Sequence, residues 1–150
     1  MDSVRRAAER VDVTGREELA ALLAMAHIES KARGKDAPTV LALLYNNIFG
    51  IKWIPGDDKC GYKAVRMPPN EFETENVLYR RYESLEHCIL SWKYLVYQSS
   101  HYRSAREAMW ETWLRKAAKV WAPSNPSHGD VLLALFGGYL DGREVHTEGD

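Results

Sequence analysis

The sequence predicts an α+β fold that is mainly α, with a helical lobe and a small β-hairpin lobe. Over most of the chain, apolar residues recur at the spacing of buried helix faces. Two shorter runs, near residues 60–67 and 72–82, are instead rich in aromatic and β-branched residues. The segment Pro68-Pro69-Asn70 separates these two runs, so we expect them to pair as one hairpin.

The bulk composition is that of an ordinary globular protein. The chain has 150 residues, of which 45% are hydrophobic and 27% charged. This length is enough for one domain with its own core, so we expect a single domain over residues 1–150. Its core should span about residues 15–140, followed by a frayed polar tail over 141–150.

The most informative predicted helix spans residues 15–32. Thr14 and Glu17 have the spacing of a capping box, in which the two side chains satisfy free backbone donors at a helix start. Gly34 is the expected stop.

The other predicted helices rest on apolar periodicity and on local start signals. Pro38 is a residue favoured in the first turn of a helix, and Ser84 is a favoured N-cap. A turn is expected at Pro55–Asp58. The remaining predicted helices span residues 3–10, 38–46, 85–98 and 128–140, with two more between 101 and 120.

Glu29 is the residue on which the functional prediction depends. Leu22, Ala26 and Glu29 are spaced i, i+4 and i+7, so they share one face of the helix. A carboxyl group on the apolar side of a helix, near a polar and aromatic loop such as Asn46–Lys52, is typical of a general acid. Burial disfavours the charged form of such a group and keeps a proton available for donation. The simpler alternative is that Glu29 forms an ion pair with Lys52 or an arginine.

Two segments around Glu29 resemble motifs of the glucosaminidase family of glycoside hydrolases. That family includes the muramidase-type domain of flagellar rod proteins, bacterial autolysins and some phage lysins. Its members have a helix ending in alanine-histidine-glutamate-serine, with the glutamate as catalytic acid, and then asparagine-leucine-phenylalanine-glycine-isoleucine-lysine. Here Ala26–Ser30 and Asn47–Lys52 fit these motifs.

Three further segments follow the family's order. Gly61–Phe72 is similar to the first strand of its hairpin, and Tyr79–Ser84 to its phenylalanine-arginine-x-tyrosine-x-serine motif. Trp121–His128 lies where the family has tyrosine-alanine-threonine-aspartate-proline-x-tyrosine. The resemblance thus covers roughly residues 15–140.

The chain also departs from the family pattern. Lys31–Gly34 stands where members usually have glycine-tryptophan-glycine, so an aromatic residue of the cleft is missing. The late tyrosine is absent too, and Ser127 and His128 are the nearby candidates for its place. These departures leave the catalytic acid unchanged and alter the residues that would contact the sugar.

The resemblance implies a lysozyme-like fold and a peptidoglycan hydrolase, specifically an endo-β-N-acetylglucosaminidase that cleaves the glycan strand with Glu29 as general acid. For the second catalytic carboxylate it favours Glu71. Glu73 and Glu75 remain competitors, because alternation along a strand places all three on one face. The substrate-binding residues that it implies are Ser30, Asn47, Phe49, Gly50, Lys52, Tyr82, Trp121 and His128.

Two alternative functions remain open from the sequence. The first is a muramidase or lytic transglycosylase on the same fold, which would cut the other glycosidic bond; a transglycosylase needs one acid and releases anhydro-sugars. The second is a non-catalytic wall-binding module, which would bind sugar without turnover.

Aromatic residues crowd the second half of the chain, and most of them belong to the predicted core. Leu85, Cys88, Ile89, Trp92 and Leu95 recur at helical spacing. Phe49 and Trp121, each inside a matched motif, are instead predicted to stack on sugar rings.

No metal or other cofactor is expected. The five histidines form neither an H-x-x-x-H nor an H-E-x-x-H pattern. His27 lies on a different face from Glu29, so a structural role is predicted for it. Cys60 and Cys88 lack metal-type spacing and are predicted to be free thiols.

The expected partner is the bacterial peptidoglycan glycan strand. A net charge of −1 gives no basic footprint for nucleic acid, and no apolar run reaches the about 18 residues that membrane insertion needs. Met1–Arg6 is polar and starts no signal peptide. We therefore expect a monomer that is made in the cytoplasm and delivered to the cell wall by another route, as a phage-encoded endolysin or a component of a phage particle is.

Overall fold

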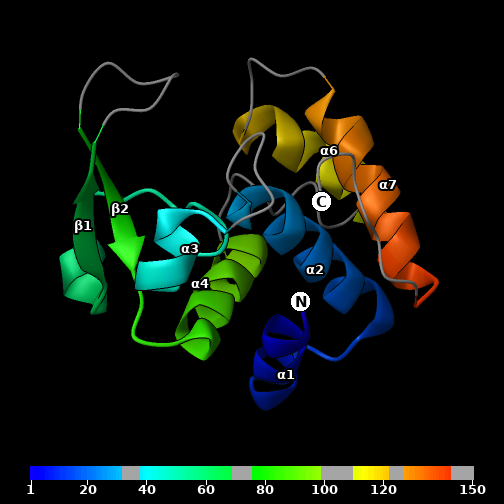
Figure 1. Cartoon of the computed structure of the whole chain (residues 1–150), viewed down its shortest axis with the longest axis horizontal. Coiled ribbons are helices and arrows are strands. Elements are labelled where there is room, and N and C mark those ends of the chain that lie inside the picture. The colour runs from blue at the N-terminus through cyan, green and yellow to red at the C-terminus, as the bar shows by residue number, and fades with distance from the viewer. Residues whose placement is uncertain (32–37, 69–75, 99–109, 122–126, 143–150) are drawn as a thin grey trace.

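The structure, a computed structural model, describes residues 1–31, 38–68, 76–98, 110–121 and 127–142. Six helices and one hairpin are present within these ranges, which confirms the predicted α+β, mainly α architecture (Figure 1). The elements are α1 (Asp2–Arg10), α2 (Arg16–Ser30), α3 (Val40–Tyr45), the 3-10 helix η1 (Asp57–Cys60), β1 (Lys63–Met67), β2 (Val77–Arg81), α4 (Leu85–Gln98), α6 (Trp110–Trp121) and α7 (His128–Leu140).

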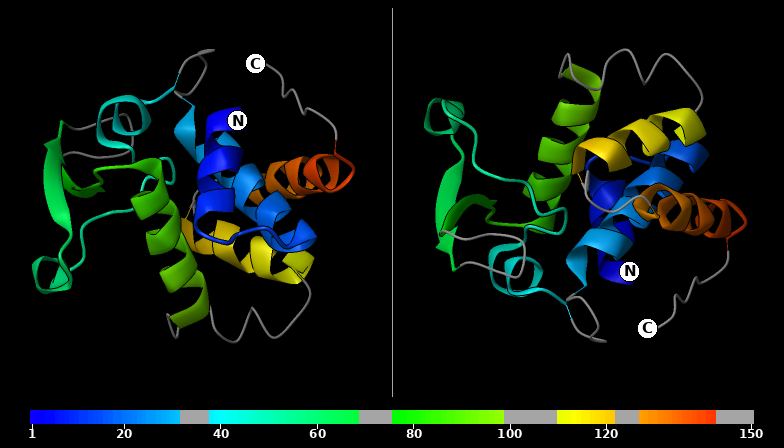
Figure 2. Two further views of the ribbon diagram at one scale, coloured as in Figure 1. Left: turned by 90° about the horizontal axis from the view of Figure 1, so that it is seen from below. Right: turned by 90° about the horizontal axis from the view of Figure 1, so that it is seen from above.

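The elements are arranged in two groups around a central helix. The hairpin lies at one end of the molecule and α6 and α7 at the other, with α2 and α4 between them, and both views in Figure 2 keep this order. Helix α2 packs against α7, α6 and α1, and α6 also packs against α7. Among the described residues, none of the helices combines the length and apolar character that crossing a bilayer requires.

Helix α2 is central because its sequence is apolar on all sides. Every residue from Ala20 to His27 is buried. This part of the helix is therefore buried on all its faces, and not only on the one apolar face that the sequence predicted. The predicted capping box is wrong: the helix begins at Arg16, its N-cap is Gly15, and no side chain caps it. Thr14 therefore lies one residue before the N-cap position, from which the side-chain bonds of a capping box would form.

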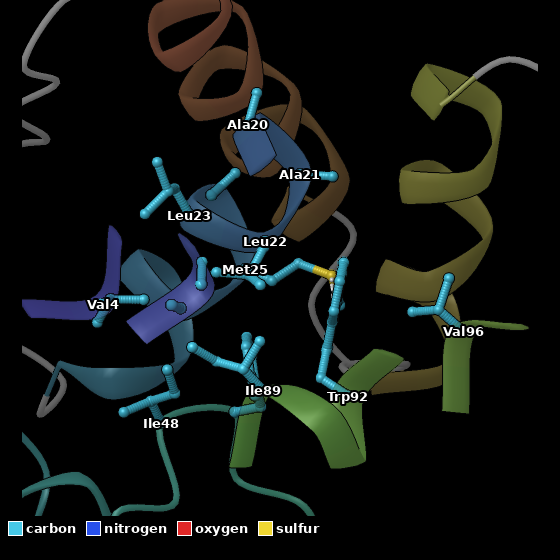
Figure 3. Packing of buried hydrophobic residues seen from close by; sticks show 14 of the residues in the cluster. Val4, Ala20, Ala21, Leu22, Leu23, Met25, Ile48, Ile89, Trp92 and Val96 are labelled. Carbon is cyan, nitrogen blue, oxygen red and sulfur yellow. Dashed lines mark hydrogen bonds between the residues drawn. The ribbon is translucent and has the colours of Figure 1, made fainter. Parts of the chain in front are cut away.

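The core joins α2 to α4 (Figure 3). Trp92 donates its indole N–H to the sulfur of Met25 at 3.4 Å, and Figure 3 shows Met25 reaching toward it. Cys88 and Ile89 are fully buried beside Trp92, which confirms the predicted core stripe of α4. Complete burial of a large apolar side chain of this kind stabilises a fold by about 1.5–3 kcal/mol.

The bounds of α4 and α7 agree with the sequence prediction, and Ser84 accepts a hydrogen bond from the backbone N–H of His87 at 3.1 Å, as a cap should. Helix α3 is shorter than predicted. Thr39 is its N-cap and accepts from the N–H of Ala42 at 3.1 Å, so Pro38 precedes the helix instead of opening it. Of the range 101–120, in which two helices were expected, residues 110–120 are described and belong to α6, whereas residues 101–109 lie outside the described residues.

The hairpin is antiparallel, with Met67 opposite Val77 and Lys63 opposite Arg81. The segment after α3 adds to its far edge: Lys52 forms a bridge with Tyr79, and the N–H of Trp53 donates to the carbonyl of Leu78 at 2.9 Å. The loop Asn47–Lys52 is therefore held against β2, which brings together two of the motifs that were matched in the sequence.

A buried ion pair joins the hairpin to the helices. Arg80 donates two hydrogen bonds to the carboxylate of Asp57, at 2.7 and 2.9 Å, and a third to Ser91 of α4 at 2.8 Å. The hydroxyls of Tyr82 and Ser91 lie 2.7 Å apart. Burial lowers the pKa of Arg80, but its bonds with Asp57 and Tyr82 outweigh this effect and raise the pKa overall. The network fixes β2 to both η1 and α4.

Both cysteines are free thiols, as predicted. Cys60 is exposed at the end of η1, whereas Cys88 is buried in α4. Burial raises the pKa of the Cys88 thiol to about 12, so this thiol remains protonated at neutral pH.

Candidate active site

Glu29 lies in the last turn of α2, where the helix leaves the core. His27, two residues earlier, is 5% exposed, and its Nδ1 lies 2.8 Å from the hydroxyl of Tyr139, which confirms its predicted structural role. The side chain of Glu29 is 24% exposed. Lys31 adopts an extended conformation and ends the helix directly after Ser30. The carboxyl group is thus attached to a rigid, buried helix but still reaches solvent.

The partner of Glu29 is His128, the first residue of α7. Nε2 of His128 lies 3.2 Å from Oε1 of Glu29, and the side chain of His128 is 11% exposed. The contact forms because α2 packs against α7, so that the end of one helix meets the start of the other. The sequence alternative, an ion pair with Lys52 or an arginine, did not include this partner.

Gly50 borders the other oxygen of the carboxyl group. Its φ angle is +64°, a conformation that side chains other than glycine rarely adopt. A Cβ atom built on Gly50 would lie 4.0 Å from Oε2 of Glu29, and among the described residues it would meet no other atom within 4 Å apart from its sequence neighbours. Within the described part of the chain, glycine therefore adds no side chain to the space beside Oε2.

Asn47 shapes the loop that carries Gly50. Its amide nitrogen donates to the carbonyls of Ile51 and Arg80, at 3.0 and 2.8 Å, and its amide oxygen accepts from the N–H of Ile51 at 3.0 Å. The residue is 1% exposed. The structure thus gives Asn47 a positioning role in the loop, in place of the direct sugar contact that was expected.

Two aromatic residues of the predicted site belong to the core. Phe49 is 2% exposed and stacks on Trp92 with ring centroids 5.8 Å apart. Tyr82 is 5% exposed, and burial raises the pKa of its phenol. Neither ring is accessible for stacking on a sugar, because each hydrophobic residue of these motifs faces inward.

Ser30 and Lys52 are the other predicted binding residues whose side chains the structure describes. Ser30 is half-buried beside Glu29, and its carbonyl accepts from the N–H of Thr39 at 2.7 Å. Lys52 is exposed on the segment that pairs with β2. Trp121 ends α6, and its side chain lies outside the description. Glu71, Glu73 and Glu75 lie outside the described residues, as does Gly34.

The structure therefore brings together Glu29, Gly50 and His128, which come from three separate matched motifs. Sequence reasoning had selected all three but missed the direct Glu29–His128 contact, for which no local spacing gives a signal. Within the ranges that the structure describes, no three side chains of His, Cys, Asp or Glu gather as metal ligands would. In chemical terms, the site presents a partly buried carboxyl group with one oxygen held by an imidazole and the other beside the backbone of Gly50, an arrangement suited to proton transfer.

No protein-family model matches the sequence, and no curated protein is significantly similar to it. The fold, in contrast, is found among solved structures. The crystal structure of a peptidoglycan hydrolase from Sphingomonas sp. A1 superposes with a TM-score of 0.61 and 19% identity, over 97% of this chain and 92% of that chain. The catalytic domain of the autolysin Auto from Listeria monocytogenes gives a TM-score of 0.57 and 18% identity, over 92% and 78%. These similarities confirm the predicted lysozyme-like fold.

Proposed function

We propose that this chain is a peptidoglycan hydrolase of the endo-β-N-acetylglucosaminidase type, with Glu29 as its general acid. The observation that carries the proposal is the position of Glu29, at the solvent-reaching end of a buried helix, with Oε2 beside Gly50. The two similar structures, a peptidoglycan hydrolase and an autolysin, support the same substrate class.

The chemistry begins with the protonated carboxyl group of Glu29. It donates its proton to the glycosidic oxygen, the bond from this oxygen to the anomeric carbon breaks, and the electron pair stays with the leaving sugar. A water molecule then adds to the anomeric carbon and transfers a proton to a base. Net hydrolysis consumes one water, and Glu29 regains its proton before the next cycle.

We assign the base role to Glu71, with Glu73 and Glu75 as competitors. All three lie in the connection between Met67 and Val77, the paired ends of β1 and β2. A second carboxylate is what most glycoside hydrolases use to activate water or to stabilise the oxocarbenium-like transition state.

The proposed partner is the glycan strand of bacterial peptidoglycan, and the proposed acting form is a monomer at the cell wall. Ser30 and Lys52 flank Glu29 and Gly50 in the chain, and we assign them, with Trp121, to substrate binding. We propose that the protein is a lysin encoded by a phage.

Product analysis on purified peptidoglycan tests the function directly. After incubation with the protein, borohydride reduction labels each newly exposed reducing end for mass spectrometry. We expect reduced N-acetylglucosamine, and no such product from a matched Glu29→Gln sample. Reduced N-acetylmuramic acid would indicate a muramidase, anhydro-sugars a lytic transglycosylase, and binding without products a non-catalytic wall-binding module.

A further inference from the structure

We propose that the two oxygens of Glu29 have separate tasks. His128 is a positioning residue that holds Oε1, and Oε2, beside Gly50, delivers the proton to the leaving sugar. This inference rests on the proposed function of Glu29 and adds which of its oxygens reacts and what orients it.

The carboxyl group of Glu29 needs a partner to fix its orientation. The last side-chain torsion of a glutamate is broad, because rotation about a bond to a planar carboxyl group has no sharp minima. A glutamate on a rigid helix therefore still presents its oxygens in many directions. A hydrogen bond to one of them removes this freedom and fixes the direction of the other.

His128 is placed to orient the carboxyl group of Glu29. Its Nε2 atom lies 3.2 Å from Oε1, which is within reach of a hydrogen bond, and its side chain is 11% exposed. The residue begins a helix that packs against α2 itself. The imidazole and the carboxyl group are thus attached to two helices in mutual contact, so their separation is set by the packing of the core.

Gly50 brings only backbone to the side of the carboxyl group on which Oε2 lies. A Cβ at Gly50 would meet Oε2 at 4.0 Å and, within the ranges that the structure describes, no other non-neighbouring atom within 4 Å. A glycosidic oxygen that approaches Glu29 over Gly50 would therefore meet Oε2 first. Oε1, already occupied by His128, is unsuited to the same task.

This role for His128 differs from direct sugar binding in what it does to the kinetic constants. If a residue binds the substrate equally well in the ground state and the transition state, its replacement raises KM and leaves kcat unchanged. A residue that orients the acid changes kcat, because misplacing a reacting group by about 1 Å can cost about 10²-fold in rate.

The test uses the full chain with His128→Leu or His128→Gln. Each substitution is made once in the parent protein and once in the protein that already carries Glu29→Gln. Soluble peptidoglycan oligosaccharides serve as the substrate. Leucine removes the ring nitrogen, whereas glutamine can place an amide N–H near the position of Nε2. We expect His128→Leu to lower kcat by about 10- to 100-fold with KM changed less than about threefold, and His128→Gln to recover most of the loss.

The Glu29→Gln background separates this inference from the proposed function. If His128 acts through Glu29, His128→Leu should cause little further loss once Glu29 is replaced. A rise in KM alone, or an equal loss in both backgrounds, would overturn the inference while Glu29 remained the acid. If Glu29→Gln kept its activity, the proposed function itself would fail. Circular dichroism and the thermal midpoint of each variant establish that the compared proteins are folded.

Discussion

Oε1 of Glu29 and Nε2 of His128 lie 3.2 Å apart, at the meeting point of the end of α2 and the start of α7. This pair differs from a fully buried ion pair because the side chain of Glu29 is 24% exposed, so water can replace part of the contact. That difference determines what a substitution of Glu29 should do.

Glu29→Gln should lose about 10²- to 10⁴-fold in rate, because glutamine keeps the shape of the side chain but its amide is too weak an acid to transfer a proton to the leaving sugar. The free energy of unfolding should fall by only about 1 kcal/mol, the net value of one hydrogen bond. A fixed buried ion pair would instead cost about 3–5 kcal/mol on removal of one partner. The rate and the thermal midpoint measure both effects. Glu83→Gln is the control, since Glu83 pairs with Lys63 at the surface. An active but much less stable Glu29→Gln protein would make Glu29 a scaffold residue.

Gly50→Ala should abolish most activity because its methyl group would occupy the space beside Oε2 of Glu29. The left-handed backbone at this position also costs about 1–2 kcal/mol with a side chain present. Gly61→Ala is the matched control: Gly61 has a φ of +83°, and its added Cβ would meet nothing within 4 Å. Both variants should lose similar stability in denaturant titrations, and only Gly50→Ala should lose activity. Equal activity in the two variants would contradict the proposed approach over Gly50.

Among the three glutamates between β1 and β2, Glu71 should carry the largest share of the activity. Glu71→Gln, Glu73→Gln and Glu75→Gln remove one possible base each and leave the size of the side chain unchanged. Rates on the same peptidoglycan sample compare them directly, and each substitution is a control for the other two. The assignment is wrong if Glu71→Gln stays active while one of its neighbours becomes inactive.

Asp57→Asn should be strongly destabilising, by about 3–5 kcal/mol, because it leaves the buried guanidinium of Arg80 without its counter-charge. Asp57 and Arg80 are 5% and 4% exposed, so water cannot replace the lost interaction. The midpoint of urea unfolding measures the effect. In the same experiment, Glu83→Gln removes a charge from an exposed pair and should cost at most about 1 kcal/mol. Similar midpoints for the two variants would show that the buried pair contributes little.

Thiol labelling should distinguish the two cysteines in the folded protein. Cys60 is exposed, whereas Cys88 is buried with its pKa raised to about 12, so few molecules carry the reactive thiolate at neutral pH. Iodoacetamide should add one group to the native protein, at Cys60, and two groups in urea. Mass spectrometry of the intact protein counts them. Rapid modification of Cys88 without urea would mean that α4 opens readily.

The sequence predicts well those features that depend on residues close together in the chain. The bounds of α4 follow from the cap at Ser84 and from its apolar repeat, and the position of Glu29 follows from its spacing to Leu22 and Ala26. The start of α2 also depends on neighbouring residues, but Thr14 and Gly15 are both acceptable N-caps. Spacing alone selected Thr14, whereas the N-cap in the structure is Gly15, so the predicted helix start was wrong.

Features that depend on packing between distant segments could not be predicted in the same way. Phe49 was expected to face a sugar, and the structure places it on Trp92 because the core of α2 and α4 requires an aromatic ring there. Asn47 forms hydrogen bonds with the backbone of both Ile51 and Arg80, and this role is visible only once the loop lies against β2. The meeting of Glu29 with His128 has the same origin.

The position of His128 in the last described helix has a consequence for the timing of activity during synthesis. A growing chain folds from its N-terminal side as it leaves the ribosome, so α2 and Glu29 emerge long before α7. Until α7 has packed against α2, Glu29 lacks the imidazole that holds Oε1. Any glycan-cleaving activity that requires this contact therefore cannot appear before α7 has been synthesised and has packed against α2.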